Sequence, residues 1–252
     1  MLFRSVVATE GERLRLVALP DDYDGTTAHP LLLAFHGHGG SKEVAMAASE
    51  LDEKGPARGY VVVFADALGD PRAWNLGDGD TDDFGFVNAL VADLGERLCI
   101  DAERVYAAGH SNGSAFTGFL ACKAPYPFAA VAMVAAFIPS TCPVDEAAPA
   151  VVAVHGTADP GVPYGGGPVA GGPVQIPAAL TTLDTYRDTY ECDPTPVEDE
   201  PEPGVQRRAY EGCLRGTEAV LYSVVDGGHE WPTERFAASD AILDFFDAHT
   251  RP

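Results

Sequence analysis

Apolar runs alternate with amphipathic stretches along most of the chain. Runs typical of strands buried on both faces of a sheet occupy residues 31–36, 60–65, 128–135, 150–154 and 218–225. Stretches with helical periodicity lie at 42–54, 83–98, 114–123, 177–190 and 235–249. Residues 3–19 alternate between apolar and polar, which predicts an antiparallel pair turning near Glu10-Gly11. Strands alternating with helices predict an α/β fold with a doubly wound, mostly parallel sheet flanked by helices.

One further apolar run, residues 104–108, leads directly into Gly109-His110-Ser111-Asn112-Gly113. A G-x-S-x-G sequence on a sharp strand-to-helix turn holds its serine away from the backbone with the hydroxyl exposed. The glycines are needed because a Cβ at either position would clash with the neighbouring strand and helix. Ser111 is therefore the predicted nucleophile.

A serine hydroxyl needs a base and a group that orients the base, and in doubly wound hydrolases these follow in the order Ser, Asp or Glu, His. Asp159 follows the run 150–154 and His229 follows the run 218–225. Both therefore come at the carboxyl edge of the sheet, where ligands bind. We predict a triad of Ser111, Asp159 and His229. Asp226 is the rival acid, but it lies too close to His229 in sequence to reach its ring easily.

The run 31–36 opens into the glycine-rich sequence His36-Gly37-His38-Gly39-Gly40. Such a loop turns backbone N–H groups toward a developing oxyanion, and the second donor is the N–H of the residue after the nucleophile. The predicted donors are the main chain of His38, or alternatively of Gly39, and of Asn112. The loop lacks the G-K-[ST] ending and the dinucleotide spacing of a phosphate cradle.

The two tryptophans, Trp74 and Trp231, follow predicted strands on the same edge. We expect both, with Gly39, to contact substrate, since aromatic side chains at a groove stack on acyl or aromatic groups; the alternative is that either belongs to the core. His110 is expected to pack beneath the strand-to-helix turn that carries Ser111, called the elbow below. His155 is expected to hold the loop that carries Asp159, the acid loop, through a hydrogen bond.

The chain resembles the α/β-hydrolase esterases that include polyhydroxybutyrate depolymerases and feruloyl esterases, a group similar to carbohydrate esterase family one. The resemblance rests on the segments His36–Gly40, Asp82–Phe86, Asp101 with Arg104–Tyr106, the Ser111 elbow, His155–Asp159 with Val162–Tyr164, and Gly227–Pro232. It implies a secreted serine ester hydrolase with Ser111, Asp159 and His229 catalytic. The two-step hydrolysis that such a triad performs needs no metal or cofactor. Ser114 departs from the family, which often has glycine there; we expect this to affect helix packing.

The resemblance leaves the substrate open. We expect a polyester, with feruloyl or acetyl esters of plant polysaccharide as the alternative. A peptidase, or a non-catalytic binder of esters or glycans, is a further alternative. The resemblance also favours disulfides Cys192–Cys213 and Cys122–Cys142, with Cys99 free; the first would restrain an acidic, proline-rich stretch at 193–204.

Length, charge and cysteine content bear on the domain organisation, the partners and the location of the protein. The 252 residues, 46% of them hydrophobic, suit one catalytic domain spanning 1–252 without a lid domain. No apolar run is long enough to span a membrane, and a net charge of −22 repels nucleic acid. The N-terminus has no signal-peptide pattern, yet disulfides favour a secreted or periplasmic protein. We expect a monomer.

The acidic run 78–83 superficially resembles a calcium loop but lacks its glycine and its final glutamate, so helix capping by Asp82 or Asp83 is favoured.

Overall fold

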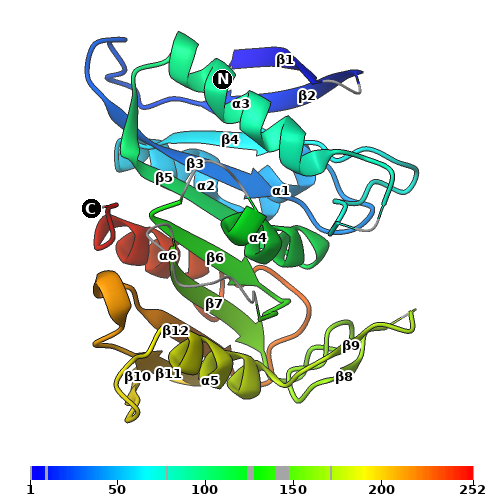
Figure 1. The fold of residues 1–252 in the computed structure, drawn as a ribbon, viewed down its shortest axis with the longest axis vertical. Helices are drawn as coiled ribbons and strands as arrows, with labels where there is room; N and C mark the ends of the chain where they lie inside the picture. Colours follow the sequence, from blue (N-terminus) through cyan, green and yellow to red (C-terminus); the bar gives the residue numbers. More distant parts are fainter. Residues whose placement is uncertain are drawn as a thin grey trace.

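A single ten-stranded sheet runs through the molecule (Figure 1). The computed structural model describes residues 2–8, 11–77, 79–123, 128–139, 148–170 and 172–251. The strands, in sheet order, are β1 (Leu2–Ala8), β2 (Gly11–Ala18), β4 (Val61–Ala65), β3 (His29–Phe35), β5 (Ile100–His110), β6 (Ala130–Val134), β7 (Ala150–Gly156), β12 (Ala219–Val224), β11 (Val205–Tyr210) and β10 (Val197–Glu202).

The six central strands, from β4 to β12, are all parallel, and antiparallel strands extend the sheet at both edges. The apolar runs of the sequence are these central strands: β3, β4, β6 and β7 are buried along their whole length. Parallel strands need helices on both faces to bury such runs. The predicted α/β fold with a mostly parallel, doubly wound sheet is confirmed.

Helices cover both faces of the sheet. On one face, in front in Figure 1, lie α3 (Asp83–Arg97), α4 (Asn112–Lys123) and α5 (Ala179–Thr189). Behind the sheet lie α1 (Lys42–Ser49), α2 (Leu51–Ala57) and α6 (Ala238–Asp247). Alternation along β3 separates the two cores: Leu31 and Leu33 face α3 and α4, whereas Leu32 and Ala34 face the α2 and α6 side.

One predicted helix differs from expectation, and two further segments contain strands that the sequence did not indicate. The predicted helix 42–54 is two helices, because Glu50 adopts a left-handed backbone with φ 57° and separates α1 from α2. The acidic stretch 193–204 contains β10, an exposed edge strand paired with β11. The glycine-rich segment after Asp159 contains β8 (Gly167–Pro168), which pairs with β9 (Gln175–Ile176). Within the described ranges, no helix has the length and apolar character needed to cross a membrane.

Candidate active site

Ser111 occupies the turn between β5 and α4 with φ 55°, a left-handed conformation that lifts its side chain out of the turn. The two elbow glycines allow the turn to pack closely, with its own backbone and the end of β3 in contact. A Cβ on Gly109 would lie 2.1 Å from the Gly113 carbonyl oxygen, and one on Gly113 would lie 2.5 Å from the Phe35 carbonyl oxygen. The expectation that both positions exclude a side chain is therefore confirmed.

The structure brings Ser111, Asp159 and His229 together from three strand ends. His229 Nε2 lies 2.8 Å from Ser111 Oγ, and His229 Nδ1 lies 2.7 Å from Asp159 Oδ2. Asp159 follows β7 and His229 follows β12, which are neighbours in the sheet. The rival acid Asp226 is exposed, and it is Asp159 that contacts the His229 ring.

The Asp159 carboxylate is buried and fully hydrogen-bonded. Its Oδ1 accepts from the backbone amides of Gly161 (2.7 Å) and Val162 (2.8 Å), and its Oδ2 faces the two histidines His229 and His155. Burial alone would raise the pKa of this carboxyl, but the hydrogen bonds from His155, Val162, His229 and Gly161 outweigh burial and lower it well below 3.8. Asp159 is therefore an anion at neutral pH and favours the charged form of His229.

His155 holds the acid loop, as the sequence suggested. Its Nε2 lies 2.9 Å from the Val162 carbonyl oxygen and 3.3 Å from Asp159 Oδ2, so this nitrogen carries the proton and donates. Its other nitrogen, Nδ1, is buried and has no hydrogen-bond partner among the described residues. One imidazole thus links both ends of the turn from Asp159 to Val162.

His110 packs against the proposed base. Its ring centroid is 5.0 Å from that of His229. Burial, reinforced by the neighbouring His229, lowers the pKa of His110 to about 4, so its ring is neutral at neutral pH. A neutral His110 places no positive charge next to His229, so it does not oppose proton uptake by the proposed base.

The glycine-rich loop after β3, which the sequence predicts to be the oxyanion loop, differs in how its two candidate amides are bonded. The Gly39 amide donates to the Arg72 carbonyl oxygen at 2.7 Å, which favours His38 over Gly39 as the predicted donor. Among the described residues, no backbone or side-chain hydrogen bond uses the amides of His38 or Asn112. His36 anchors the loop, because its Nε2 accepts from the Ala67 amide at 3.0 Å and its Nδ1 donates to the Gly37 carbonyl at 2.7 Å.

Trp74 lies in the core, and its expected place at the rim of a groove is wrong. Its side chain is 2% exposed and stacks on Phe116, because the loop that carries it folds inward over α4. The indole Nε1 donates to the His36 carbonyl at 3.0 Å. The Asn112 side chain accepts from the Trp74 amide at 2.7 Å and donates to its carbonyl at 3.1 Å. Trp74 and Asn112 thus brace the elbow against β3, a role that no sequence signal indicated.

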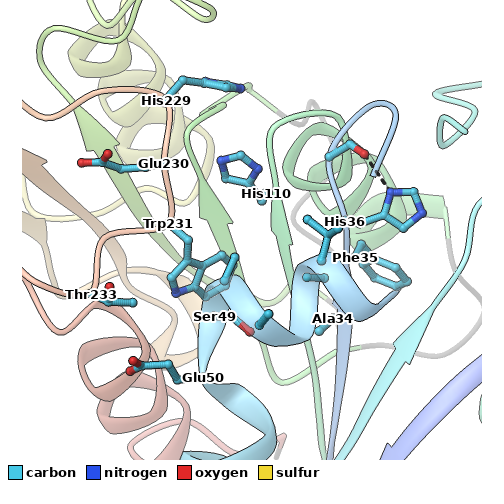
Figure 2. Close-up of a pocket in the computed structure, with 15 residues that line it drawn as sticks. Ala34, Phe35, His36, Ser49, Glu50, His110, His229, Glu230, Trp231 and Thr233 are labelled. Atoms are coloured by element: carbon cyan, nitrogen blue, oxygen red, sulfur yellow. Dashed lines mark hydrogen bonds between the residues drawn. The ribbon is translucent and has the colours of Figure 1, made fainter. Parts of the chain in front are cut away.

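Trp231 is half-buried and lines a cavity of about 420 Å³ next to His229. Figure 2 shows His229 and Glu230 at one end of the labelled residues and Glu50 at the other, with Trp231 between them. The indole Nε1 donates to Ser239 Oγ at 2.9 Å, which fixes the ring. The position of Trp231 is compatible with substrate contact, which stays a prediction.

The predictions on the cysteines and on the acidic run 78–83 have the following outcomes. Cys192 and Cys213 form a disulfide and Cys99 is a free thiol, as predicted; Cys142, and with it the Cys122–Cys142 pair, lies outside the described residues. Asp82 caps α3 by accepting from the Gly85 amide at 2.7 Å. Asp78 also lies outside the described residues, and those described contain no group of three or more His, Cys, Asp or Glu side chains that could hold a metal ion.

Ser114, the departure from the family pattern, is buried. Its hydroxyl donates to the Ala136 carbonyl at 2.7 Å, at the end of β6. The substitution therefore adds a hydrogen bond between α4 and the segment after β6, in line with an effect on packing.

Comparisons with known proteins agree with this architecture. Residues 47–141 match the model of the prolyl oligopeptidase family. Feruloyl esterase B of Piromyces equi is 29% identical over 227 residues, covering 85% of this chain and 42% of that enzyme. Feruloyl esterase C of Emericella nidulans is 26% identical over 245 residues, covering 92% of this chain and 83% of the relative.

Solved structures show the same fold. An acetyl xylan esterase from Aspergillus awamori superimposes with a TM-score of 0.72 at 13% identity, over 98% of this chain and 99% of that one. An esterase from Thermogutta terrifontis superimposes with a TM-score of 0.65 at 14% identity, over 98% of this chain and 94% of the other.

Proposed function

We propose that this chain is a serine esterase of the α/β-hydrolase superfamily in which Ser111, His229 and Asp159 hydrolyse feruloyl or acetyl esters of a polysaccharide. The observation that carries the mechanism is the continuous chain of contacts from Asp159 through His229 to Ser111, at 2.7 and 2.8 Å. The names of the relatives, feruloyl esterases and an acetyl xylan esterase, support the substrate class.

The geometry supports a two-step mechanism. His229 Nε2 takes the proton of Ser111 Oγ as the oxygen attacks the ester carbonyl, and Asp159 holds the imidazole tautomer and stabilises the imidazolium. The amides of His38 and Asn112 donate to the oxyanion of the tetrahedral intermediate. His229 then protonates the leaving alcohol, and water activated by His229 cleaves the acyl-enzyme. No step needs a metal or cofactor.

Ser111→Ala tests the mechanism. We expect kcat on methyl ferulate and on p-nitrophenyl acetate to fall by at least about 10⁴-fold, because the nucleophile is absent. Mass spectrometry of the wild-type protein treated with a fluorophosphonate should locate the label on Ser111. Near-native turnover by Ser111→Ala, or a label elsewhere, would contradict the proposed role of this residue. A wild-type protein that turns over neither ester would favour a non-catalytic binder.

A substrate panel tests the specificity. Feruloylated arabinoxylan, acetylated xylan, polyhydroxybutyrate and an acylated peptide separate the proposed activity from the polyester expected on sequence grounds and from a peptidase. We expect product release from the two polysaccharides to be fastest. The Cys192–Cys213 disulfide supports export to an oxidising compartment, which we propose as its location; the monomeric state stays a prediction.

A further inference from the structure

The cavity of about 420 Å³ lies behind the sheet, on the side covered by α1 and α6. One wall is α1, which contributes small side chains such as Ala45 and Ala48. The opposite wall is the segment that follows His229 and includes Trp231 and Thr233. A volume of this size is typical of a ligand site.

The cavity borders the point where an ester would react. His229 and Gly37 both line it. His229 Nε2 is 2.8 Å from Ser111 Oγ, and a Cβ built on Gly37 would lie 3.2 Å from Ser111 Cβ. An ester held by Ser111 therefore has one of its two halves at the mouth of this cavity.

The proton transfer from His229 to the leaving oxygen decides which half of the ester lies at the cavity. His229 has to protonate the leaving oxygen, so that oxygen lies within hydrogen-bond reach of His229 Nε2 in the tetrahedral intermediate. The alcohol half of the ester continues from there past the His229 ring. The residues beyond that ring are Glu230, Trp231 and Thr233, which line the cavity. The cavity is thus placed for the alcohol rather than for the acyl group.

The lining favours a polyhydroxy alcohol. Trp231 presents a flat apolar ring held in place by Ser239, on which the C–H face of a sugar can pack. The carboxylates of Glu230 and Glu50 accept hydrogen bonds but cannot donate. Among the residues that the structure describes, only Glu50 of the two pairs with a cation, Lys54 Nζ at 3.2 Å. Sugar hydroxyls supply the matching donors. A polyester segment carries only carbonyl and ester oxygens between its ends, which are acceptors.

We propose that this cavity is a saccharide subsite that binds the sugar carrying the ester, an assignment that rests on the proposed esterase function. The test compares two ferulate esters that differ only in the alcohol: methyl ferulate and a feruloylated methyl arabinofuranoside. Ala48→Phe and Thr233→Phe fill the cavity from opposite walls. Ala102→Phe, at an exposed alanine at the start of β5 and away from the cavity, is the matched control.

We expect wild-type protein to prefer the sugar ester, and the ratio of kcat/KM for the sugar ester to that for methyl ferulate to fall at least tenfold in both cavity variants. The control should keep the wild-type ratio. Circular dichroism melting identifies a variant that fails to fold, in which case the variant on the other wall gives the answer.

Three results would overturn the subsite. They are a wild-type protein without preference for the sugar ester, a ratio that falls less than tenfold, and an equal loss on both esters, which would assign the cavity to the acyl half. Failure of the esterase function itself gives a different signature, since the wild-type protein would then hydrolyse neither ester, and failure of the proposed nucleophile would leave turnover in Ser111→Ala.

Discussion

Asp159 is held by donors from three directions, which fix its carboxylate against the His229 ring. Two amides of its own turn bind Oδ1, and His229 and His155 both face Oδ2. His155 is therefore a positioning residue, because it reaches the reacting atoms only through Asp159. Its Nε2–H also binds the Val162 carbonyl, so removing the ring affects both ends of the turn at once.

The variant His155→Leu should lose about 1.5–3 kcal/mol of unfolding free energy at pH 7, because a buried carboxylate loses a donor. The pKa of Asp159 is lowered in the folded state, so this group stabilises the fold above pH 3.8, and the stabilisation is lost as the pH falls toward the folded pKa. His155→Leu weakens that shift, and its stability should therefore fall less steeply than that of the wild type below pH 3.8. Urea unfolding at several pH values measures both effects.

His155→Gln provides the control, since its amide N–H can replace the donor while the ring is absent. It should retain more stability and more turnover of methyl ferulate than His155→Leu. Equal losses in the two variants would show that ring packing, rather than the hydrogen bond to Asp159, accounts for the effect.

At the scale of elements, the site depends on how closely the elbow approaches β3. Gly113, in the first turn of α4, lies against the carbonyls of Phe35, the last residue of β3, and of His36, which follows it. The same junction is braced by Trp74 and Asn112. Since β3 leads into the oxyanion loop, this contact sets the distance between the proposed nucleophile and the His38 amide.

Gly113→Ala should destabilise the protein by several kcal/mol and lower kcat on methyl ferulate more than it changes KM. The added Cβ would lie 2.5 Å from two backbone oxygens, so β3 and the elbow have to move apart, and a small misplacement of catalytic groups is costly. Thermal melting and steady-state kinetics measure the two effects.

Gly95→Ala is the matched control for Gly113→Ala. Gly95 lies inside α3, and a Cβ there would meet nothing within 4 Å. This change should stabilise the protein by about 0.4–1 kcal/mol, because alanine loses less backbone entropy on folding. If both variants behaved alike, the close approach of elbow and strand would not be the reason for the elbow glycine.

At the scale of the whole molecule, the sequence predicted the order of the strands and the positions of the triad, but not which loop side chains are buried. Apolar runs marked the parallel strands, and motifs placed Ser111, Asp159 and His229 at strand ends. The burial of Trp74 was not predictable, because its loop is polar around it and only the folded contact with α4 covers the ring. Strand β10 was missed because four of its six residues are acidic and all six are exposed, which suits an edge strand that must avoid pairing with other chains.

That edge has little core of its own, which gives the Cys192–Cys213 disulfide its importance. The bridge spans 21 residues and encloses β10 and β11, beyond β12 at the end of the sheet. Replacing both cysteines by serine should cost about 3 kcal/mol of stability, because the unfolded chain gains freedom.

Turnover of methyl ferulate at 25 °C by this double variant should stay within about twofold of wild type, because β7 and β12, which carry Asp159 and His229, keep their parallel pairing without the bridge. Cys99→Ser, at the free thiol, controls for the loss of sulfur and should change neither quantity. A double variant that melts like the wild type would show that the pairing of β10 and β11 with β12 holds the edge unaided. One that is fully folded but inactive would show that this edge positions the acid or the base.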